Sequence, residues 1–274
     1  MSLFITSLNS GSNGNCYYIA NNNEAVLVDV GISCRETEKR MLRLGLSMEK
    51  VKAIFISHEH SDHIRGLEVI SRKYQLPVYI TKKTLKNSQL KLDPKQIKSF
   101  TDHKPVSIGK LSVIPFTKKH DASDPYSFIV SGNGLKIGVL TDIGSVCKNV
   151  IAYFGQCNAV FLEANYDTEM LETGKYPYFL KKRISADHGH LSNEQALELF
   201  TKHRSKALDL VLLSHLSKDN NDPELVHRLF KKHAGKTKII VASRYEETAV
   251  YNITDKNISW KKIGVQQSTQ MSMF

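Results

Sequence analysis

The chain has 274 residues, 41% of them hydrophobic and 24% charged, a globular balance that excludes a mainly disordered protein. It carries 38 Lys and Arg against 27 Asp and Glu, so its formal net charge is +11. This charge suits polyanionic partners, although a solvated lysine-rich surface would have the same charge. The four cysteines form no C-x-x-C pair and show no tight spacing, so the sequence indicates neither a zinc knuckle nor a disulfide framework. The segment "MSLFITSLNSGSNG" has no basic start and no long apolar core, and no run reaches about 18 apolar residues. We therefore expect a cytoplasmic protein without a secretory leader or a membrane span.

The first half of the chain reads as short strands followed by alternating strands and helices. The segments "FITSL", "YYIA" and "AVLVDV" have the composition of strands, and residues 33–44 have helical spacing that ends at Gly45. A strand is expected over residues 52–57, a helix over residues 64–74, and another strand after Pro77.

The second half repeats this style. The expected strands are "LSVIPF", "YSFIVS", "LKIGVLTD", "AVFLEAN" and "LDLVLLSH", with helices between them. Ser192 fits the N-cap of a helix, and Gln195 three residues later completes a capping box. No linker or repeat divides the chain, so we expect one α/β domain over residues 1–274, with two facing sheets covered by helices. The tail from about residue 253 is expected to be an edge strand or a loose end.

The segment "HEHSDH", residues 58–63, is the strongest functional signal in the sequence. Neutral imidazoles and carboxylates hold zinc-like and manganese-like ions, and this segment supplies both directly after an apolar strand. His58 and His60 are two residues apart, so both can point to one metal. Asp62 and His63 lie beyond the turn and can face a second metal, which predicts a metal site with further ligands elsewhere.

Candidates for those further ligands follow other strands of the sequence. They are His120 in "KKHDASDP", Asp142 in "VLTDIG" and His215 in "LLSHLS". Functional groups in α/β folds gather at strand ends, which favours a shared site. A single histidine at a strand end is nevertheless more often a hydrogen-bonded structural residue.

The pattern H-x-H-x-D-H after a strand, with an upstream Asp and later His, Asp and His residues, resembles the metallo-β-lactamase superfamily. This resemblance spans nearly the whole chain and implies a four-layer αββα sandwich with a two-metal hydrolase site. By it, one metal would be held by His58, His60 and His120, the other by Asp62, His63 and His215, with Asp142 bridging. Asp29 in "LVDVG" matches the superfamily residue that orients the histidine segment; alternatively it caps a turn after a strand.

The superfamily contains lactamases, thioesterases, lactonases, nucleases and phosphodiesterases, so the fold alone does not choose an activity. A Cys in place of Asp142 would suggest a true β-lactamase, and the Asp points elsewhere. Glu163 in "FLEANYD" and His190 in "DHGHLSNEQA" resemble the pair that assists cleavage in transfer-RNA 3′-processing endonucleases. His190 can also be read as a polar residue preceding a helix.

A more specific resemblance is to the YycJ/WalJ family of small bacterial proteins with this fold. It is carried by "SGSNGN", "FISHEHSDHIRGLEVISRKYQLPVY", "HDASDP", "LTDIG", "LEANYDTEML", "GKYPYFLKKRISADHGHLSN" and "LSHLSKDNN". This resemblance implies a 5′→3′ exonuclease acting on double-stranded DNA. His188 is an extra imidazole near His190 without an assigned role, and the tail after Asn252 matches nothing in the family.

The expected chemistry is phosphodiester hydrolysis by a hydroxide that bridges two divalent ions, zinc or manganese, with iron also compatible with the ligands. His190, held by Glu163, would stabilise charge on the phosphorus centre or protonate the leaving oxygen. The expected catalytic residues are Asp29, Asp62, Glu163 and His190.

Two segments are candidates for substrate binding. In "SGSNGN", the residues Ser12, Asn13 and Asn15 belong to a flexible loop suited to phosphate, although such a loop is often only a turn. In "KYPYFLKKR", cations alternate with aromatic rings, which suits a nucleic-acid strand, although a solvated basic loop has the same composition. The candidate cations are Lys181, Lys182 and Arg183.

Two alternatives stay open. One is a small-molecule hydrolase on the same two-metal site, acting on a cyclic phosphodiester or a thioester. The other is a metal-stabilised DNA-binding protein without turnover. The sequence does not indicate the oligomeric state.

Overall fold

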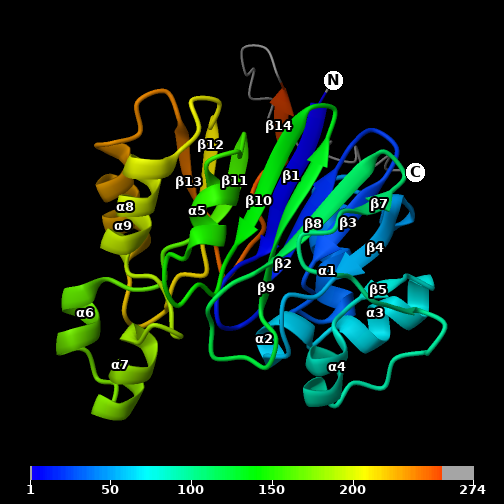
Figure 1. Cartoon of the computed structure of the whole chain (residues 1–274), viewed down its shortest axis with the longest axis horizontal. Helices are drawn as coiled ribbons and strands as arrows, with labels where there is room; N and C mark the ends of the chain where they lie inside the picture. Colours follow the sequence, from blue (N-terminus) through cyan, green and yellow to red (C-terminus); the bar gives the residue numbers. More distant parts are fainter. Residues whose placement is uncertain (1, 255–274) are drawn as a thin grey trace, which may run out of the picture.

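The computed structural model describes residues 2–254 and contains two seven-stranded sheets (Figure 1). The strands of the first sheet are β1 (Ser2–Asn9), β2 (Cys16–Ala20), β3 (Ala25–Val28), β4 (Val51–Phe55), β5 (Val78–Tyr79), β6 (Ile97–Lys98) and β14 (Tyr251–Thr254). Their order in the sheet is β14-β1-β2-β3-β4-β5-β6. The pairs from β14 to β3 are antiparallel, and those from β3 to β6 are parallel.

The second sheet is built in the same way from the second half of the chain. Its strands are β7 (Val106–Ile108), β8 (Leu111–Thr117), β9 (Tyr126–Gly132), β10 (Leu135–Leu140), β11 (Ala159–Glu163), β12 (Leu210–Ser214) and β13 (Lys238–Val241). Their order is β13-β12-β11-β10-β9-β8-β7, antiparallel from β7 to β10 and parallel from β10 to β13. Every residue of β11 and β12 is buried, as expected for parallel strands covered on both faces.

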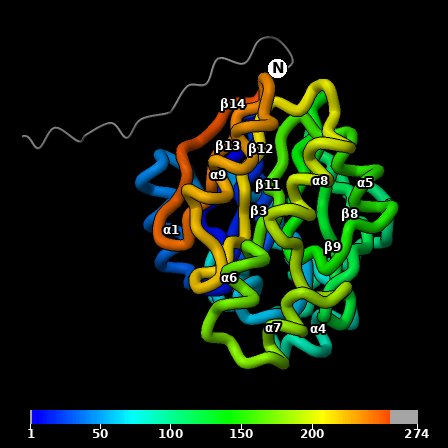
Figure 2. The backbone as a smooth tube through the Cα atoms, turned by 90° about the vertical axis from the view of Figure 1, so that its left-hand side faces the viewer, coloured from blue at the N-terminus to red at the C-terminus, as the bar shows by residue number. Residues whose placement is uncertain are grey.

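The helices of the described chain are α1 (Cys34–Arg43), η1 (Met48–Lys50), α2 (Ser61–Ile64), α3 (Leu67–Tyr74), α4 (Lys82–Ser88), α5 (Lys148–Phe154), α6 (Thr168–Thr173), α7 (Tyr178–Ser185), α8 (Asn193–His203) and α9 (Pro223–Lys231). Several of them cover the outer faces of the two sheets. Buried side chains of α1 and α3 join the core on the first sheet's outer face, and those of α5, α8 and α9 join the core on the second sheet's outer face. Figure 2 shows α1 on one side of the strands and α5 and α8 on the other. The predicted αββα sandwich is confirmed.

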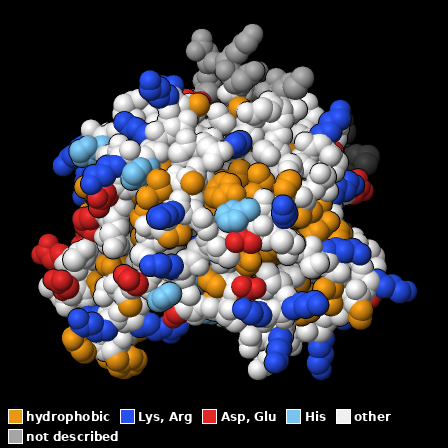
Figure 3. Space-filling view, viewed as in Figure 1, with side chains coloured by type: hydrophobic (Ala, Val, Ile, Leu, Met, Phe, Trp, Pro, Cys, Tyr) orange, Lys and Arg blue, Asp and Glu red, His pale blue; other side chains and the backbone are white. Residues whose placement is uncertain are grey.

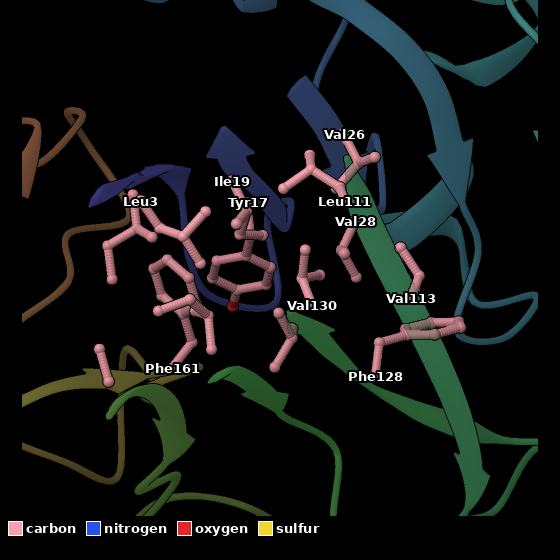
Figure 4. Close-up of a cluster of buried hydrophobic side chains, with 14 of the residues drawn as sticks. Leu3, Tyr17, Ile19, Val26, Val28, Leu111, Val113, Phe128, Val130 and Phe161 are labelled. Atoms are coloured by element: carbon pink, nitrogen blue, oxygen red, sulfur yellow. The ribbon is translucent and has the colours of Figure 1, made fainter. Parts of the chain in front are cut away.

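The central core lies between the inner faces of the two sheets (Figure 4). Tyr17 of β2 packs against Phe161 of β11, with ring centroids 4.8 Å apart. Phe55 of β4 packs against Phe128 of β9, with ring centroids 5.7 Å apart. These contacts join the two sheets and fix their strand ends relative to each other.

Two helix predictions compare directly with the structure. The capping box of Ser192 and Gln195 is present at the start of α8. The helix expected over about residues 64–74 ends at Tyr74 as predicted. Its start was wrong, since α2 begins at Ser61 and the helix is interrupted before α3 begins at Leu67. At the interruption, the backbone N–H of Gly66 donates to the carbonyl of Val30, 2.9 Å away, in place of an α-helical bond.

The chain after Asn252 begins as an edge strand, because β14 pairs with β1. Residues 255–274 lie outside the described residues, so the single domain over residues 1–274 stays a prediction. Within residues 2–254, no helix has both the length and the apolar character needed to cross a membrane.

Candidate metal centre

Side chains that follow several strand ends gather in one cluster. The helices α2 and α7 lie at the edge of the sandwich that Figure 1 shows at the bottom. Asp29, Asp142 and His215 follow β3, β10 and β12, and their φ angles are 59°, 55° and 57°. A left-handed backbone is uncommon outside glycine, and it clusters at functional sites because surrounding contacts must hold it in place. These three bends bring side chains from both sheets into one cluster.

The first group of potential ligands contains three histidines. The segment after β4 carries His58 and leads into α2, with His60 at the helix N-cap. Nδ1 of His60 lies 3.0 Å from Nε2 of His58 and 3.4 Å from Nε2 of His120. His58 and His120 are buried. Three imidazole nitrogens at this spacing form a suitable metal-ligand set.

The second group contains carboxylates as well as imidazoles. Oδ2 of Asp62 lies 3.4 Å from Nε2 of both His63 and His215. Asp142 lies between the two groups. Its Oδ2 is 3.3 Å from Nε2 of His63, and its Oδ1 is 3.4 Å from Nε2 of His215 and 3.9 Å from Nε2 of His120. The structure thus brings together the seven residues that the sequence pattern named as ligands.

The donor atoms of the cluster suit divalent metal ions. Oδ2 of Asp142 is buried, and apart from its 3.3 Å contact with Nε2 of His63 it makes no hydrogen bond among the described residues. A buried carboxylate oxygen with so few partners is costly, and a cation would stabilise it. The remaining donors are imidazole nitrogens and carboxylate oxygens, which zinc, manganese and iron all accept.

Asp29 contacts the ligands from behind. Its Oδ2 lies 2.8 Å from Nδ1 of His63, and it accepts hydrogen bonds of 2.8 Å from the backbone N–H and the hydroxyl of Ser57. The Ser57 hydroxyl lies 2.8 Å from Nδ1 of His58. These contacts hold both imidazoles with Nε2 turned to the centre, as carboxylates behind metal-bound histidines do.

Glu163 orients two further imidazoles from the end of β11. Its Oε1 lies 2.8 Å from Nδ1 of His190 and 3.1 Å from Nδ1 of His215. Its Oε2 accepts hydrogen bonds from the backbone N–H groups of Ile143 and Leu191, at 2.7 and 3.2 Å. Burial alone would raise the pKa of Glu163, but His190 and His215 lower it to about 2. Glu163 is therefore a fixed carboxylate that couples His190 to the ligand cluster.

The histidines of the cluster differ in their affinity for protons. Burial lowers the pKa of His58 well below its ordinary value. Burial also disfavours the charged form of His215, but Asp142, Asp62 and Glu163 raise its pKa to about 10. The pKa of His63 is raised well above its ordinary value because Asp142, Asp62 and Asp29 outweigh its burial. Before a metal ion binds, these raised pKa values favour the protonated forms of His63 and His215.

We expect the affinity for divalent metal to rise with pH. A ligand imidazole must be neutral, so metal binding displaces the protons of His63 and His215. Because these pKa values are raised, the protons compete more strongly as the pH falls. The apparent affinity should increase by up to about tenfold per pH unit for each displaced proton. Competition with a chromophoric chelator between about pH 6 and pH 9 measures this slope, and a pH-independent affinity would contradict it.

Gly31 allows the histidine segment to dock on the rest of the site. A Cβ atom at position 31 would collide with the backbone carbonyl of Asp62. The close approach permits two backbone hydrogen bonds. The N–H of Asn15 donates to the Asp62 carbonyl at 2.7 Å, and the N–H of Gly31 donates to the Asn15 carbonyl at 2.8 Å. The start of α2 is thereby fixed against the loop after β1.

We expect Gly31→Ala to displace Asp62 and to weaken metal binding. The collision is with backbone atoms, which cannot rotate away, so the free energy of unfolding should also fall by about 1–3 kcal/mol. Gly155→Ala is the matched control, since Gly155 has an α-helical φ of −62° and its nearest contacts would lie at 3.3 Å. Chemical denaturation and metal analysis of both variants would test this. Equal metal content in the two variants would contradict the role of Gly31.

The three candidate substrate residues of the first loop lie in different environments. Ser12 and Asn13 are exposed, and Ser12 lines the cleft at the centre. Asn15 differs from the expectation, because its side chain is buried and Nδ2 lies 3.1 Å from both Oδ2 of Asp62 and Nε2 of His63. Asn15 therefore has no exposed surface to offer a substrate, and its contacts suit a role in positioning these two side chains.

The basic segment forms α7 at the rim of the cleft. Arg183 lines the cleft, and its Nε lies 2.6 Å from Oδ2 of Asp121. Lys181 and Lys182 line a neighbouring hollow instead, where Nζ of Lys181 donates to the carbonyl of Glu172. His188 is exposed and is not part of the ligand groups.

Two buried polar residues of the site were missed in the sequence. Nδ2 of Asn165 lies 3.2 Å from Nδ1 of His215 and donates to the carbonyl of the same residue at 2.7 Å. Lys118 is buried two residues before His120, and its Nζ donates to the carbonyl of Thr141 at 2.6 Å. Asn and Lys are not specific for metal sites. The sequence could have pointed to these two residues only through their places two residues from Glu163 and His120.

Comparison with known proteins agrees with this geometry. Residues 24–216 match the family model described as "Beta-lactamase superfamily domain". The chain is 37% identical over 230 residues to the exodeoxyribonuclease YycJ of Bacillus anthracis, covering 82% of this chain and 86% of that protein. The chain belongs to the YycJ/WalJ family of the metallo-β-lactamase superfamily. This YycJ/WalJ family member is also 35% identical to the exodeoxyribonuclease WalJ of Streptococcus pneumoniae strain D39, covering 80% of this chain and 84% of that protein.

The fold of this YycJ/WalJ family member also occurs in solved structures. The metallo-β-lactamase fold protein YhfI from Bacillus subtilis aligns with a TM-score of 0.71 and 16% sequence identity. The alignment covers 92% of this chain and 99% of YhfI. At this identity, the similarity supports the fold and carries no information on substrate.

Proposed function

We propose that this chain is a metal-dependent exodeoxyribonuclease that hydrolyses phosphodiester bonds with two divalent ions. The observation that carries the proposal is the pair of ligand groups joined by Asp142, in a chain 37% identical to an exodeoxyribonuclease over most of its length. Duplex DNA is the proposed substrate and digestion from the 5′ end the proposed direction. The formal net charge of +11 supports a polyanionic substrate, and Figure 3 shows Lys and Arg side chains spread over one face. We place the reaction in the cytoplasm.

The proposed metal ligands follow the two geometric groups. His58, His60 and His120 would hold one ion, and Asp62, His63 and His215 would hold the other. Asp142 would bridge them, since Oδ1 lies near His120 of the first group and near His215 of the second, and Oδ2 lies near His63 of the second. Zinc and manganese are the proposed ions, and iron also fits these donors. When bound, the ions would supply an activated water molecule and neutralise charge on the phosphate.

His190 is the proposed catalytic residue of the chain itself. It lines a cleft of about 270 Å³ together with Asp62, Asp142 and His215. Because Glu163 holds Nδ1, Nε2 is the nitrogen left for a substrate. From there it would donate a proton to the leaving oxygen or a hydrogen bond to the phosphate. Asp29, Asn15 and Glu163 would position the ligands and His190 without touching the substrate.

The proposed substrate contacts come from two segments at the cleft. Ser12 and Arg183 line it, and Asn13 is the exposed neighbour of Ser12. Lys181 and Lys182 of α7 line the neighbouring hollow, where they would contact the phosphates of a DNA strand that leaves the cleft. The exposed rings of Tyr178 and Phe179 on the same helix add surfaces on which bases can stack.

The experiment that tests this function compares polymers with and without free ends. Metal-loaded protein is incubated with linear duplex DNA, closed-circular duplex DNA of the same sequence, RNA, and a small phosphodiester. We expect digestion of the linear DNA only, with mononucleotides released from the 5′ end. Cleavage of the circle would replace the exonuclease by an endonuclease. Turnover of only the small phosphodiester would favour the small-molecule hydrolase.

A further inference from the structure

A second cavity lies directly beside the metal cleft. It has a volume of about 240 Å³ and is lined by parts of the loop after β1, the segment after β12 and the segment after β13. Ser10 lines it, and the hydroxyl of Ser10 accepts a hydrogen bond of 2.8 Å from the backbone N–H of His215. Ser12, which lines the metal cleft, lies 3.3 Å from Nη2 of Arg244 in the wall of the second cavity. The two spaces therefore share the Ser10–Ser12 loop and the end of β12 as a wall.

The polar side of this cavity suits a phosphate group. Arg244 and Lys218 line it, together with the hydroxyl-bearing residues Ser10, Ser217 and Ser243, and no Asp or Glu is among its described lining residues. Nη1 of Arg244 is withdrawn from solvent and has no hydrogen-bond partner among residues 2–254. A buried guanidinium N–H without an acceptor is costly. An anionic oxygen in the cavity would supply the acceptor after a small rotation of the Arg244 side chain.

The backbone around Arg244 is fixed before any ligand binds. Nη2 of the buried Arg40 donates to the carbonyl of Tyr245 at 2.9 Å, and Nδ2 of Asn13 donates to the carbonyl of Arg244 at 2.8 Å. The N–H of Ser10 donates to the carbonyl of Ser243 at 3.1 Å. The segment carrying Arg244 is thus tied to the same loop that borders the metal cleft, so the cavity is held in a constant position next to the ligands.

The other side of the cavity is apolar. Leu216, Pro223, Val241 and Ala242 line it, and the Tyr245 ring at the opening is 71% exposed. A nucleobase combines an apolar face with a polar edge, and exposed tyrosine rings are common stacking surfaces for bases. The cavity therefore offers a cationic side and an apolar side within one space, which matches a nucleotide better than a free inorganic anion.

We propose that this cavity binds the 5′-terminal nucleotide of the DNA strand, with its phosphate monoester at Arg244 and Lys218. The inference rests on the proposed nuclease function and specifies how the enzyme recognises a strand end. The metal cleft alone cannot distinguish the end of a strand from its interior, because the phosphodiesters that it binds are chemically alike along the whole strand. A terminal phosphate monoester carries about −1.5 to −2 charge at neutral pH, more than any internal phosphodiester. A neighbouring cationic cavity converts this difference into a preference for the end.

The test compares digestion of duplex DNA carrying 5′-phosphate or 5′-hydroxyl ends. We expect the metal-loaded wild type to digest 5′-phosphorylated DNA about tenfold faster or more, and Arg244→Gln to lose most of this preference. The rate on 5′-hydroxyl DNA should fall by a much smaller factor in the variant. Lys218→Gln, which removes an exposed cation, should reduce the preference by a smaller factor. Arg72→Gln, an exposed site on α3 with the same charge change, is the control and should keep the wild-type preference.

Equal wild-type rates on both ends would overturn the proposal. So would an Arg244→Gln variant that slows both substrates equally, because Arg244 would then only hold the loop. Binding of thymidine 5′-monophosphate and of thymidine, measured by calorimetry, judges the cavity separately from nuclease activity. If Arg244→Gln and Lys218→Gln bind the monophosphate more weakly but bind thymidine as the wild type does, the cavity proposal is supported. If the protein digests no DNA in that case, only the proposed nuclease function is wrong. Unchanged binding in both variants would overturn the cavity proposal.

Discussion

Asp142→Asn is expected to abolish DNA digestion and to strip the centre of most of its metal. Oδ1 of Asp142 lies 3.9 Å from Nε2 of His120 and 3.4 Å from Nε2 of His215, one ligand from each group. Its buried Oδ2 lies 3.3 Å from Nε2 of His63. Replacing one oxygen by an amide removes the negative charge while keeping the shape of the side chain. Metal affinity should fall by more than about 100-fold, the upper range for residues that merely support a ligand.

Asparagine is preferred to alanine at this position for a conformational reason. Asp142 has a φ of 55°, which Asn adopts readily and Ala adopts with strain. Asp93→Ala, in an exposed loop, is the control for loss of a carboxylate. Metal analysis of the purified variants and digestion of linear duplex DNA provide the readout. An Asp142→Asn variant with two bound ions and wild-type turnover would exclude the bridging role.

His190→Ala is expected to lower turnover by about 10²- to 10⁴-fold while metal content stays at the wild-type level. His190 lies close enough to Asp142, Glu163 and His215 to share an ion with them, but its Nδ1 lies 2.8 Å from Glu163 and we propose that Nε2 faces the substrate in the cleft. It is therefore left out of the two proposed ligand sets. Loss of the imidazole should therefore affect a step that follows metal and DNA binding. Accordingly, kcat should fall with little change in KM.

The same loop supplies the control for this substitution. His188 is two residues away and exposed, so His188→Ala removes an imidazole without touching the ligand cluster. We expect this variant to digest DNA at the wild-type rate. If His190→Ala lost metal, the residue would belong to the ligand shell. If His190→Ala digested DNA as fast as His188→Ala, the catalytic role would be wrong.

The ligand cluster could be predicted from the sequence because its residues follow buried strands. "HEHSDH", Asp142 and His215 each come directly after an apolar run, and parallel strands within one sheet end at the same edge. The left-handed backbone at Asp142 and His215 was not predictable from local preference. Contacts from both sheets are needed to hold such a conformation.

The environments of the loop residues could not be predicted. "SGSNGN" is a flexible polar segment by composition, yet Asn15 is buried against Asp62 while Ser12, three residues earlier, is exposed. The difference arises from the close approach of Gly31 to the Asp62 backbone, which is set by tertiary packing. The position of Arg244 could not be predicted for the same reason. It lies beside this loop because of contacts between segments more than 200 residues apart in the sequence.

The most direct measurement of the central claim is the rate of duplex DNA digestion as a function of bound metal. Protein freed of metal by a chelator is loaded with manganese or zinc in steps, and metal content and digestion rate are measured on the same samples. We predict no digestion without metal and a rate that reaches its maximum at two ions per chain. Digestion that persists after complete metal removal, or its absence at every metal load, would contradict a two-metal exodeoxyribonuclease.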